Sequence, residues 1–369
     1  MNSHIIERYE QTAVNCLTGS YSVLAGIAGR PVEEQAVFER GDGYLFQAGL
    51  DESGYPEYIF PVEEAGALGM TRSAFTVHKE PVDFDATGPQ LAALLKRYRA
   101  VVVWVNTAHL NYADVYRDNA PYLHAVVVDT IADDHGHVEV HDSLVVDLKP
   151  FSCRAVVTLD DLIRSAGDRI RSEAHDAMGF FYAISDDATA PPGEGRPDEA
   201  VLSGALPRQA ERFFAEDRFR EAIRRYQALC EECFAGPPER ATRGARRLFH
   251  HASVLYAVPS LKLMADSLRA AGASPSSLAL HEEAMRHWEA MGVLALRYEA
   301  TTAPSVLSRM TRRFGLLDEV TVKLWESVAA DTGSRGEPAV PSTRAAGQRT
   351  ATTGTAPGVG LPPGQGLRQ

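Results

Sequence analysis

The sequence predicts an α+β domain over residues 1–185 that is followed by an all-helical domain over residues 200–330. The chain has 369 residues, and at about 150 residues per domain this length suggests two domains. Residues 100–141 contain three short runs of β-branched residues bounded by turn residues, a pattern typical of strands. After a linker rich in Pro, Gly and acidic residues at 185–200, the pattern becomes helical and rich in Arg and Ala.

The α+β domain is expected to begin with two helices. Apolar residues recur at helical spacing from Leu17 to Ala28, which predicts a helix from Cys16 to Gly29. A second, short helix is expected over residues 33–39. The turn Gly41-Asp42-Gly43 follows it, and its glycines permit a tight turn with positive φ.

The rest of this domain is expected to consist mainly of strands. Residues 44–90 are irregular in pattern, with short strand candidates at 58–62 and 73–78. Stronger strand candidates follow at 100–105, 124–129 and 138–141, and 179–184 closes the domain. Between the last two, Thr158 and Asp161 form a capping-box-like start for a helix over 159–172.

The second half is expected to be helical and to end in a disordered tail. Prolines separate its periodic segments, and proline fits the first turn of a helix. From about Asp331 the chain has almost no large apolar residues, so we expect residues 331–369 to be disordered. The expected helices cover residues 206–234, 240–257, 259–271, 276–300, 304–313 and 315–330.

Charge and composition exclude several classes of protein. The net charge of −12 argues against general nucleic-acid binding. No apolar run approaches the roughly 20 residues that a membrane span needs. The N-terminal stretch has no signal-peptide-like apolar segment, so we expect a cytoplasmic protein. Four cysteines are too few for a disulfide scaffold.

Three residues form a candidate catalytic group. Cys16 lies at the start of a predicted helix, where the partial positive charge of the helix end favours a thiolate. A nucleophilic cysteine needs a base and a group that orients the base; His124 opens one strand candidate and Asp142 ends the next. The backbone N–H of Cys16, with the side-chain amide of Gln11 or Asn15, is a candidate oxyanion hole. The order of the three residues along these elements is that of papain-like enzymes.

The sequence around these residues resembles the N-terminal domain of the butirosin biosynthesis protein H family. The resemblance covers roughly residues 10–145, and the helical half offers no specific motif. The matching residues are Asn15-Cys16, Ser20, Val23-Leu24, Glu34, Val37-Phe38, Gly41-Asp42-Gly43-Tyr44-Leu45-Phe46, Val103-Trp104-Val105, Leu110, Tyr112, His124-Ala125-Val126-Val127-Val128 and Val138-Glu139-Val140-His141-Asp142.

The resemblance implies a papain-like fold and an acyltransferase of secondary-metabolite biosynthesis. By this match, Cys16 would be the nucleophile, His124 the general base and acid, and Asp142 the orienting carboxylate. The donor would be an acyl thioester on the phosphopantetheine of an acyl or peptidyl carrier protein, or on coenzyme A. The acceptor would be a small-molecule amine or hydroxyl, and no further cofactor or metal is expected. Candidate substrate-binding residues are Gly43, Tyr44, Asn106 and Tyr112.

Other readings of the same residues remain open. With water as acceptor the machinery would be a thioesterase, and with an internal nucleophile a cyclase, because the difference lies in pocket shape and water exclusion. A papain-like peptidase would cut a peptide and ignore thioester donors. A catalytically silent binding protein would keep the fold with a Cys16 of ordinary reactivity.

The helical half carries a basic surface that would suit an acidic carrier protein. Residues 1–200 have 15 Lys/Arg and 32 Asp/Glu, whereas residues 201–369 have 22 and 17. We therefore expect the carrier to dock on the helical side, with the acidic half repelling it. A homodimer through the helical surface is compatible with the sequence, which contains no interface motif. The candidate docking residues are Arg224, Arg225, Arg243, Arg246 and Arg247.

Two further patterns are weaker site signals. Asp133-Asp134-His135-Gly136-His137, together with His141, has residue types that bind metals, but a polar turn between strands explains it more simply. Cys230 and Cys233 have CxxC spacing within a helical stretch, without a second cysteine pair or a thioredoxin-like context. Neither pattern predicts a metal or redox site.

Overall fold

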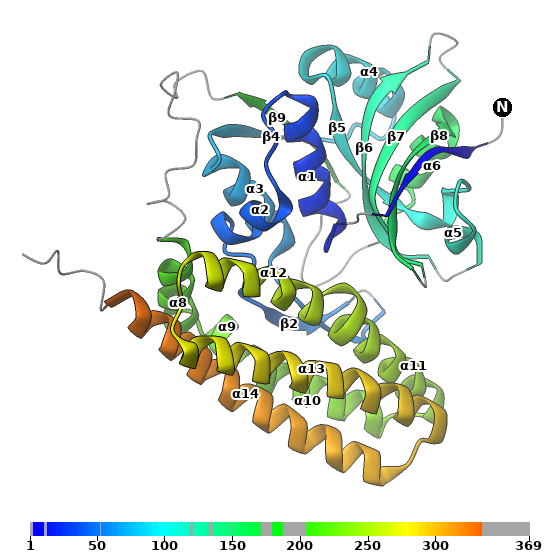
Figure 1. The fold of residues 1–369 in the computed structure, drawn as a ribbon. Helices are drawn as coiled ribbons and strands as arrows, with labels where there is room; N and C mark the ends of the chain where they lie inside the picture. Colours follow the sequence, from blue (N-terminus) through cyan, green and yellow to red (C-terminus); the bar gives the residue numbers. More distant parts are fainter. Residues whose placement is uncertain are drawn as a thin grey trace, which may run out of the picture.

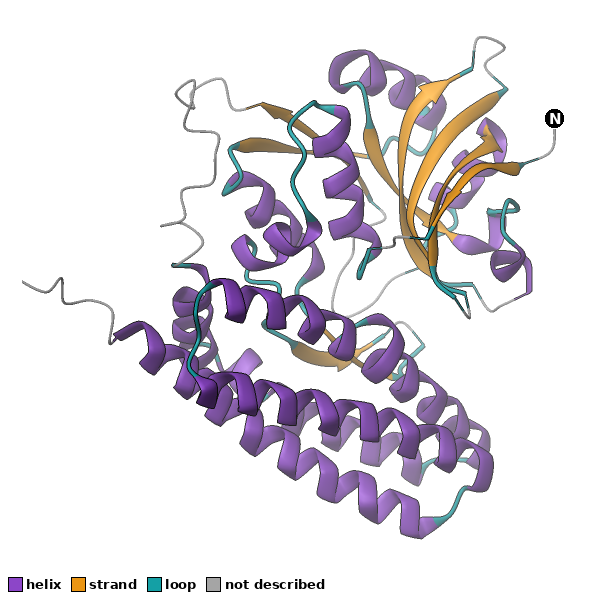
Figure 2. Cartoon of the chain, viewed as in Figure 1, coloured by secondary structure: helices purple, strands orange, loops and turns teal. Residues whose placement is uncertain are grey.

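The structure, a computed structural model, combines a large antiparallel sheet flanked by helices with a set of packed helices (Figures 1 and 2). The sheet lies in the first half of the chain, and the long helices lie in the second half. In Figure 1 helix α12 (Ala257–Ala270) runs along the boundary between the two parts. The structure describes residues 3–10, 13–51, 53–118, 121–132, 136–147, 149–170, 179–186 and 204–333.

Seven strands form the main sheet in the order β1-β8-β7-β6-β5-β9-β4, and each neighbouring pair is antiparallel. In its register, Val105 pairs with His124 and Val127 pairs with His141. The strands are β1 (His4–Tyr9), β4 (Phe75–Pro81), β5 (Val101–Asn106), β6 (Leu123–Ile131), β7 (His137–Val145), β8 (Phe151–Thr158) and β9 (Phe180–Asp186).

Both faces of the sheet are buried, which explains why its central strands are continuous β-branched runs rather than alternating patterns. On β6, Ala125 and Val127 belong to the core under α1, and Val126 and Val128 belong to the core on the opposite face. The first face is covered by α1 (Cys16–Ile27), α2 (Glu34–Arg40) and α3 (Val62–Thr71); the second by α4 (Thr87–Tyr98), α5 (Asp114–Asp118) and α6 (Leu159–Gly167).

The helical half has its own core, built around large aromatic side chains such as Tyr226, Trp288 and Phe314. Helices α11 and α13 each begin with a proline. Proline lacks an N–H, but an N–H in the first turn has no acceptor within the helix, so no hydrogen bond is lost. The helices are α8 (Ala205–Ala215), α9 (Asp217–Arg220), α10 (Ala222–Ala235), α11 (Pro238–Phe249), the π-helical segment His250–Leu255, α12, α13 (Pro275–Thr301) and α14 (Pro304–Gly333).

A hairpin from the first half completes this core. Strands β2 (Gln47–Leu50) and β3 (Pro56–Ile59) pair with each other, and Tyr58 places its ring 5.1 Å from Tyr226 and 4.9 Å from Trp288. The two halves therefore share buried surface.

Many expected elements are confirmed. Helices α1 and α2, strands β5, β6, β7 and β9, and helix α6 lie within a few residues of their expected bounds. In residues 44–90 the strand candidates at 58–62 and 73–78 overlap β3 and β4, but strand β2, helix α3 and the start of α4 were not expected. Strands β1 and β8 were missed: exposed residues dominate β1, while β8 alternates buried and half-buried residues.

The helical half differs from expectation in its breaks. The segment expected as one helix over 206–234 is three helices, whereas 304–313 and 315–330 are one helix, α14, that continues through Gly315. The linker at 185–200 lies almost wholly outside the described residues, since only its first two residues belong to β9. Of the expected tail, residues 331–333 end α14 and the rest lies outside the described residues.

The Gly41-Asp42-Gly43 turn was interpreted wrongly. The positive φ, 62°, falls on Asp42, and neither glycine has one. The glycines are needed for close packing instead: a Cβ on Gly41 would lie 1.9 Å from the Ala65 carbonyl oxygen, and one on Gly43 would lie 2.6 Å from the Phe38 ring.

Within the described residues, no helix has both the length and the hydrophobicity that a membrane span requires.

Candidate active site

Cys16 is the first residue of helix α1, and a network of hydrogen bonds holds the chain around it. The side chain of Asn15 caps the helix, because its Oδ1 accepts the N–H groups of Leu17 (2.9 Å) and Thr18 (3.3 Å). The Glu34 carboxylate accepts the N–H groups of Val14 and Asn15 at 2.7 and 3.0 Å, and the Thr18 hydroxyl at 2.6 Å. The backbone that carries the thiol is thereby fixed from both sides.

The helix start is also tied to strand β7. The Ser143 hydroxyl donates to the Cys16 carbonyl at 3.2 Å, and the Ala13 N–H donates to the Ser143 carbonyl at 2.9 Å. Gly19 permits this approach, because a Cβ there would lie 2.6 Å from Ser143 Oγ. Since Ser143 follows Asp142 directly, these contacts fix Cys16 relative to the candidate carboxylate.

The first turn of α1 leaves one backbone donor open. Gly19 donates its N–H to the Asn15 carbonyl, and Asn15 Oδ1 takes the N–H groups of the two residues before Gly19. Among the described residues, the N–H of Cys16 has no acceptor, as expected for the first residue of a helix. An N–H at this point can donate a hydrogen bond to the oxyanion that forms on a substrate carbonyl when the thiolate attacks it.

His124 and Asp142 form a buried pair. His124 Nε2 lies 2.9 Å from Asp142 Oδ1, and the two side chains are 2% and 0% exposed. They come from neighbouring antiparallel strands, β6 and β7, as the sequence predicted. The Leu144 N–H also donates to Asp142 Oδ1, at 3.0 Å.

This pairing keeps both groups charged. Burial lowers the pKa of His124, but the charge of Asp142, together with hydrogen bonds to Asp142 and Cys16, raises this pKa to about 10. Burial raises the pKa of Asp142, but the charge of His124 and hydrogen bonds from His124, Tyr112 and Tyr116 hold it below its usual value. The stable form is an imidazolium beside a carboxylate.

Cys16 takes part in the same group, because its hydrogen bond and its charge contribute to the raised pKa of His124. Asp142 and Tyr116 both contact Nε2 of His124, so Nδ1 is the ring nitrogen that remains for the thiol. Cys16 is half-buried, whereas Cys153, Cys230 and Cys233 are buried. The structure therefore brings together Cys16, His124 and Asp142.

Tyrosines surround this group. Tyr112 donates its hydroxyl to Asp142 Oδ2 at 2.6 Å, and Tyr116 donates to the same oxygen. The charge of Cys16 also influences Tyr122, two residues before His124, and Tyr256 from the helical half. Tyr256 follows the π-helical segment directly, so this electrostatic interaction reaches the thiol from the helical half.

Sequence reasoning missed Tyr116, Tyr122 and Tyr256. Two of them lie close in sequence to residues that were singled out: Tyr116 is four residues after Tyr112, and Tyr122 is two residues before His124. Nothing local could indicate Tyr256, because its position depends on how the two halves pack.

The candidate substrate-binding residues lie elsewhere or have other roles. Tyr112 is buried and donates its hydroxyl to Asp142 Oδ2. Asn106 caps a short 3₁₀ turn through Oδ1 and donates Nδ2 to Asp168 at 3.0 Å, which uses both of its polar atoms. Gly43 is packed against Phe38.

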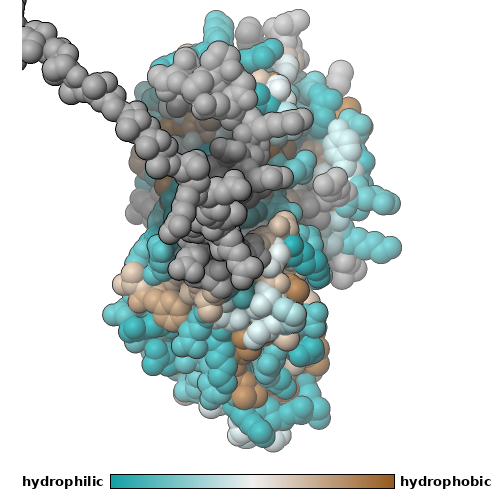
Figure 3. Space-filling view, turned by 60° about the vertical axis from the view of Figure 1, so that its left-hand side comes forward, coloured by the Kyte–Doolittle hydropathy of each residue, from teal (hydrophilic) through white to brown (hydrophobic). Residues whose placement is uncertain are grey.

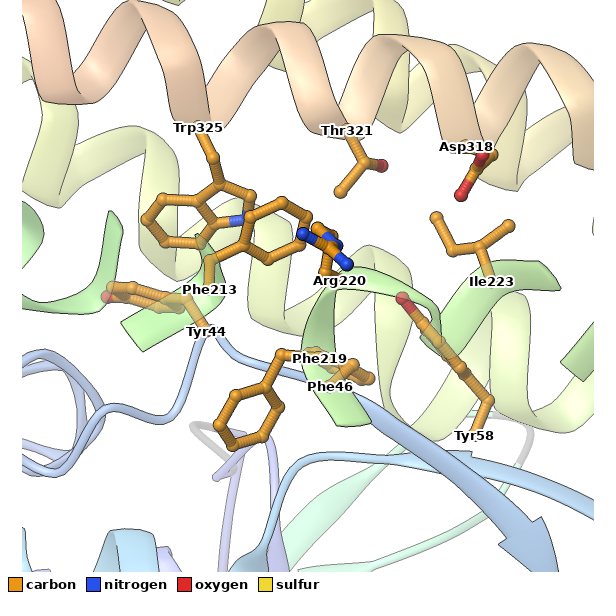
Figure 4. Close-up of a pocket in the computed structure, with 10 residues that line it drawn as sticks. All are labelled: Tyr44, Phe46, Tyr58, Phe213, Phe219, Arg220, Ile223, Asp318, Thr321 and Trp325. Atoms are coloured by element: carbon orange, nitrogen blue, oxygen red, sulfur yellow. The ribbon is translucent and has the colours of Figure 1, made fainter. Parts of the chain in front are cut away.

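Tyr44 lies at the boundary between the two halves. Its hydroxyl is 2.8 Å from Ser267 Oγ, and its N–H donates to Gln209 Oε1 at 3.1 Å. It lines two neighbouring cavities of about 20 and 40 Å³, enclosed by aromatic rings that include Phe46, Tyr58 and Trp325 (Figure 4). Cavities of this size hold a few water molecules at most, so they do not form a substrate pocket.

Of the two proposed oxyanion amides, the structure describes Asn15. Asn15 Oδ1 is used by the helix cap, and its Nδ2 has no acceptor among the described residues. Gln11 lies outside the described residues.

Some arginines of the helical half form ion pairs with carboxylates of the acidic half. Arg208 and Arg212 bind Asp42, each at 2.8 Å, and Arg247 binds Asp51. The basic charge of Arg208, Arg212 and Arg247 is therefore at least partly balanced within the chain.

Among the five candidate docking residues, three are paired within the chain. Arg246 bonds to Glu299 at 2.8 Å, Arg224 lies 3.6 Å from Asp318, and Arg247 is half-buried in its pair with Asp51. Arg225 and Arg243 are exposed and form no ion pair with any residue that the structure describes. On the face shown in Figure 3, the helical half is mainly hydrophilic, with small separate hydrophobic areas.

The weaker site signals do not form metal clusters. Over the described ranges, no group of three or more His, Cys, Asp and Glu side chains could hold a metal ion. His141 pairs with Asp129 at 2.8 Å, and Cys230 and Cys233 are buried free cysteines in α10. Residues 133–135 of the polar turn lie outside the described residues.

No protein-family model matches the chain, and no curated protein is significantly similar to it in sequence.

Proposed function

We propose that this protein is a cysteine-dependent acyltransferase with Cys16 as nucleophile. One arrangement carries the proposal: Ser143, next to Asp142, bonds to the Cys16 carbonyl at 3.2 Å, and the buried Asp142 lies 2.9 Å from Nε2 of His124. A packing role for each residue taken alone does not explain why a half-buried thiol, an imidazole and a carboxylate follow one another in this order.

The reaction has two steps. The Cys16 thiolate attacks the carbonyl carbon of an acyl thioester, and the resulting oxyanion binds the N–H of Cys16, with Asn15 Nδ2 or Gln11 as a second donor. The carbon–sulfur bond of the donor breaks, and its thiol leaves with a proton from His124. An amine or hydroxyl then attacks the acyl-enzyme, His124 takes its proton, and Cys16 is released as thiolate.

The donor and acceptor are proposed by class only. A thioester on a phosphopantetheine arm, carried by an acidic carrier protein or by coenzyme A, fits a nucleophilic thiol, and a small amine or hydroxyl compound would accept the acyl group. Transfer to water or to an internal nucleophile uses the same groups, so a thioesterase or cyclase is an outcome of the test. Arg225 and Arg243 are the proposed contacts for an acidic carrier, because their charges are not used within the described chain.

Intact-mass spectrometry with a panel of acyl thioesters tests the proposal. We expect a mass gain equal to the acyl group in the full-length protein, its loss in Cys16→Ala, and its retention in Cys153→Ala, which removes a buried thiol on β8. Charge reversal at Arg225 and Arg243 should slow acylation by a carrier-bound donor and leave acylation by the coenzyme A donor unchanged. A Cys16 that gains no acyl group and alkylates no faster than free cysteine would overturn the proposal in favour of a binding protein.

A further inference from the structure

Two tyrosine hydroxyls converge on one oxygen of the candidate catalytic carboxylate. Tyr112 donates to Asp142 Oδ2 at 2.6 Å, and Tyr116 donates to the same atom. The other oxygen, Oδ1, accepts from His124 Nε2 at 2.9 Å and from the Leu144 N–H at 3.0 Å. A carboxylate has about four lone-pair sites, so these four donors leave no place for a proton.

Tyr116 contacts both members of the pair. Its hydroxyl is 3.2 Å from His124 Nε2 in addition to its bond to Asp142. Nε2 is held by both groups, so when the imidazolium gives up a proton it loses the one on Nδ1, and the neutral ring keeps its hydrogen on Nε2 and presents a basic Nδ1 to Cys16. A ring with the other tautomer would have no basic nitrogen toward the thiol.

The two tyrosines are held in place as a unit. Tyr112 and Tyr116 are 6% and 3% exposed, and their rings pack edge to face with centroids 5.3 Å apart. Burial and the charge of Asp142 raise the pKa of both far above its usual value, so both hydroxyls stay protonated and act as donors.

We propose that Tyr112 and Tyr116 are positioning residues that keep Asp142 ionised and fixed, so that His124 faces Cys16 in its productive tautomer. This inference rests on the proposed cysteine chemistry. It predicts that the two hydroxyls act together, since each can partly replace the other at Oδ2.

Other titratable groups also lie near Asp142, and their ionisation contributes to the pH dependence of Cys16 reactivity. Cys16 lies on α1, Tyr122 and His124 at the start of β6, and Cys153 on β8; an open cavity on the other side of Asp142 is lined by Glu33, Glu34, Tyr9 and His141. Within the described residues, the side-chain hydrogen bonds to Oδ2 come from Tyr112 and Tyr116, and none comes from these other groups.

The test measures the rate at which iodoacetamide alkylates Cys16 in the full-length protein between pH 4 and pH 10. In this reaction the thiolate sulfur bonds to the CH₂ carbon and iodide leaves, so the rate reports the thiolate without requiring the natural donor. Removing a donor from Asp142 favours protonation of its carboxylate, which withdraws the support for the imidazolium beside the thiolate. In Tyr116→Phe we therefore expect the low-pH limb of the profile to move up by about one pH unit.

The double variant and a matched control make the test specific. Tyr112→Phe/Tyr116→Phe should move the limb by more than the sum of the two single variants, because no hydroxyl then remains at Oδ2. Tyr182→Phe removes a tyrosine–carboxylate hydrogen bond of 2.7 Å to Glu63, away from the site, and should leave the profile unchanged.

Each outcome separates the inference from the proposed function. A wild-type limb that depends on His124 but does not move in the tyrosine variants, with only a lower melting temperature, overturns the positioning role and leaves the cysteine chemistry standing. A wild-type profile like that of a free thiol overturns the proposed function. A moved limb together with a more-than-additive double variant supports the inference.

Discussion

At the scale of single residues, the buried pair of His124 and Asp142 has a comparison in the same sheet. His141 and Asp129 also join β6 to β7, at 2.8 Å, but each of these side chains is 20% exposed. Two pairs of the same chemistry thus differ mainly in burial. Removing one partner of a buried pair leaves an uncompensated charge, whereas a partly exposed charge is solvated.

The buried pair should make stability depend on pH in a defined window. The pKa of His124 is raised to about 10, so its contribution is complete below its unfolded pKa of about 6.5 and is lost as pH rises toward 10. The pKa of Asp142 is lowered, so its contribution is present above about pH 4 and is lost as pH falls. The pair therefore stabilises the fold most between about pH 4 and 6.5.

We expect Asp142→Asn to lower the free energy of unfolding by about 3 kcal/mol at pH 6, and by clearly less at pH 9. Asp129→Asn should cost less than about 1 kcal/mol at both pH values. Urea denaturation at the two pH values measures both variants. An Asp142→Asn deficit that stays constant from pH 6 to pH 9 would contradict this assignment of charge.

At the scale of elements, the helices beside Cys16 approach one another closely because glycine lies at their contacts. A Cβ on Gly66 of α3 would lie 2.5 Å from the Tyr21 ring of α1, and one on Gly69 would lie 2.4 Å from the Val37 carbonyl of α2. Helix α1 therefore packs closely between α3 and the sheet. The orientation of its first turn, and so of the thiol, follows from this packing.

Two glycine substitutions in this region should have opposite effects. Gly41→Ala would bring a Cβ to 1.9 Å from the backbone carbonyl of Ala65, and backbone cannot move aside cheaply. We expect it to lower the free energy of unfolding by about 2 kcal/mol or more. Gly26→Ala, in α1, meets nothing within 4 Å and should raise it by about 0.5 kcal/mol. Thermal and urea denaturation compare the two; a neutral Gly41→Ala would show that α2 and α3 are free to separate.

At the scale of the whole molecule, the acidic half and the basic half meet at one buried carboxylate, which binds arginines from both halves. The Asp42 side chain is 0% exposed and lies within 3.2 Å of Arg72, 2.8 Å of Arg208 and 2.8 Å of Arg212. Two of these arginines come from α8, so Asp42 joins the sheet domain to the helices. The helical half that contributes Tyr256 is held near Cys16 by such contacts.

We expect Asp42→Asn to lower the free energy of unfolding by about 3 kcal/mol, because three guanidinium groups lose their shared carboxylate. Asn also tolerates the positive φ of this position, so the change tests the charge rather than the backbone. Asp266→Asn, whose partner Arg269 is 2.7 Å away and whose side chain is 60% exposed, should change stability by less than about 0.5 kcal/mol. Urea denaturation measures both, and equal effects would contradict a special role for Asp42.

The sequence by itself determined the parts of this protein that depend on local pattern. The thiol at the start of a helix and the neighbouring strands that carry His124 and Asp142 follow from short-range periodicity and turn residues. For the same reason it predicted that these three side chains could meet.

Only the tertiary structure decided what surrounds them. Tyr112, a candidate substrate-binding residue, donates its hydroxyl to Asp142. Of the five candidate docking arginines, Arg247 pairs with Asp51 of the acidic half, and Arg224 and Arg246 pair within the helical half. Tyr256, 240 residues after Cys16 in the chain, interacts electrostatically with the thiol because the two halves pack together. Polar and charged side chains satisfy themselves with whichever partners folding brings near, and their local sequence does not record which partners those are.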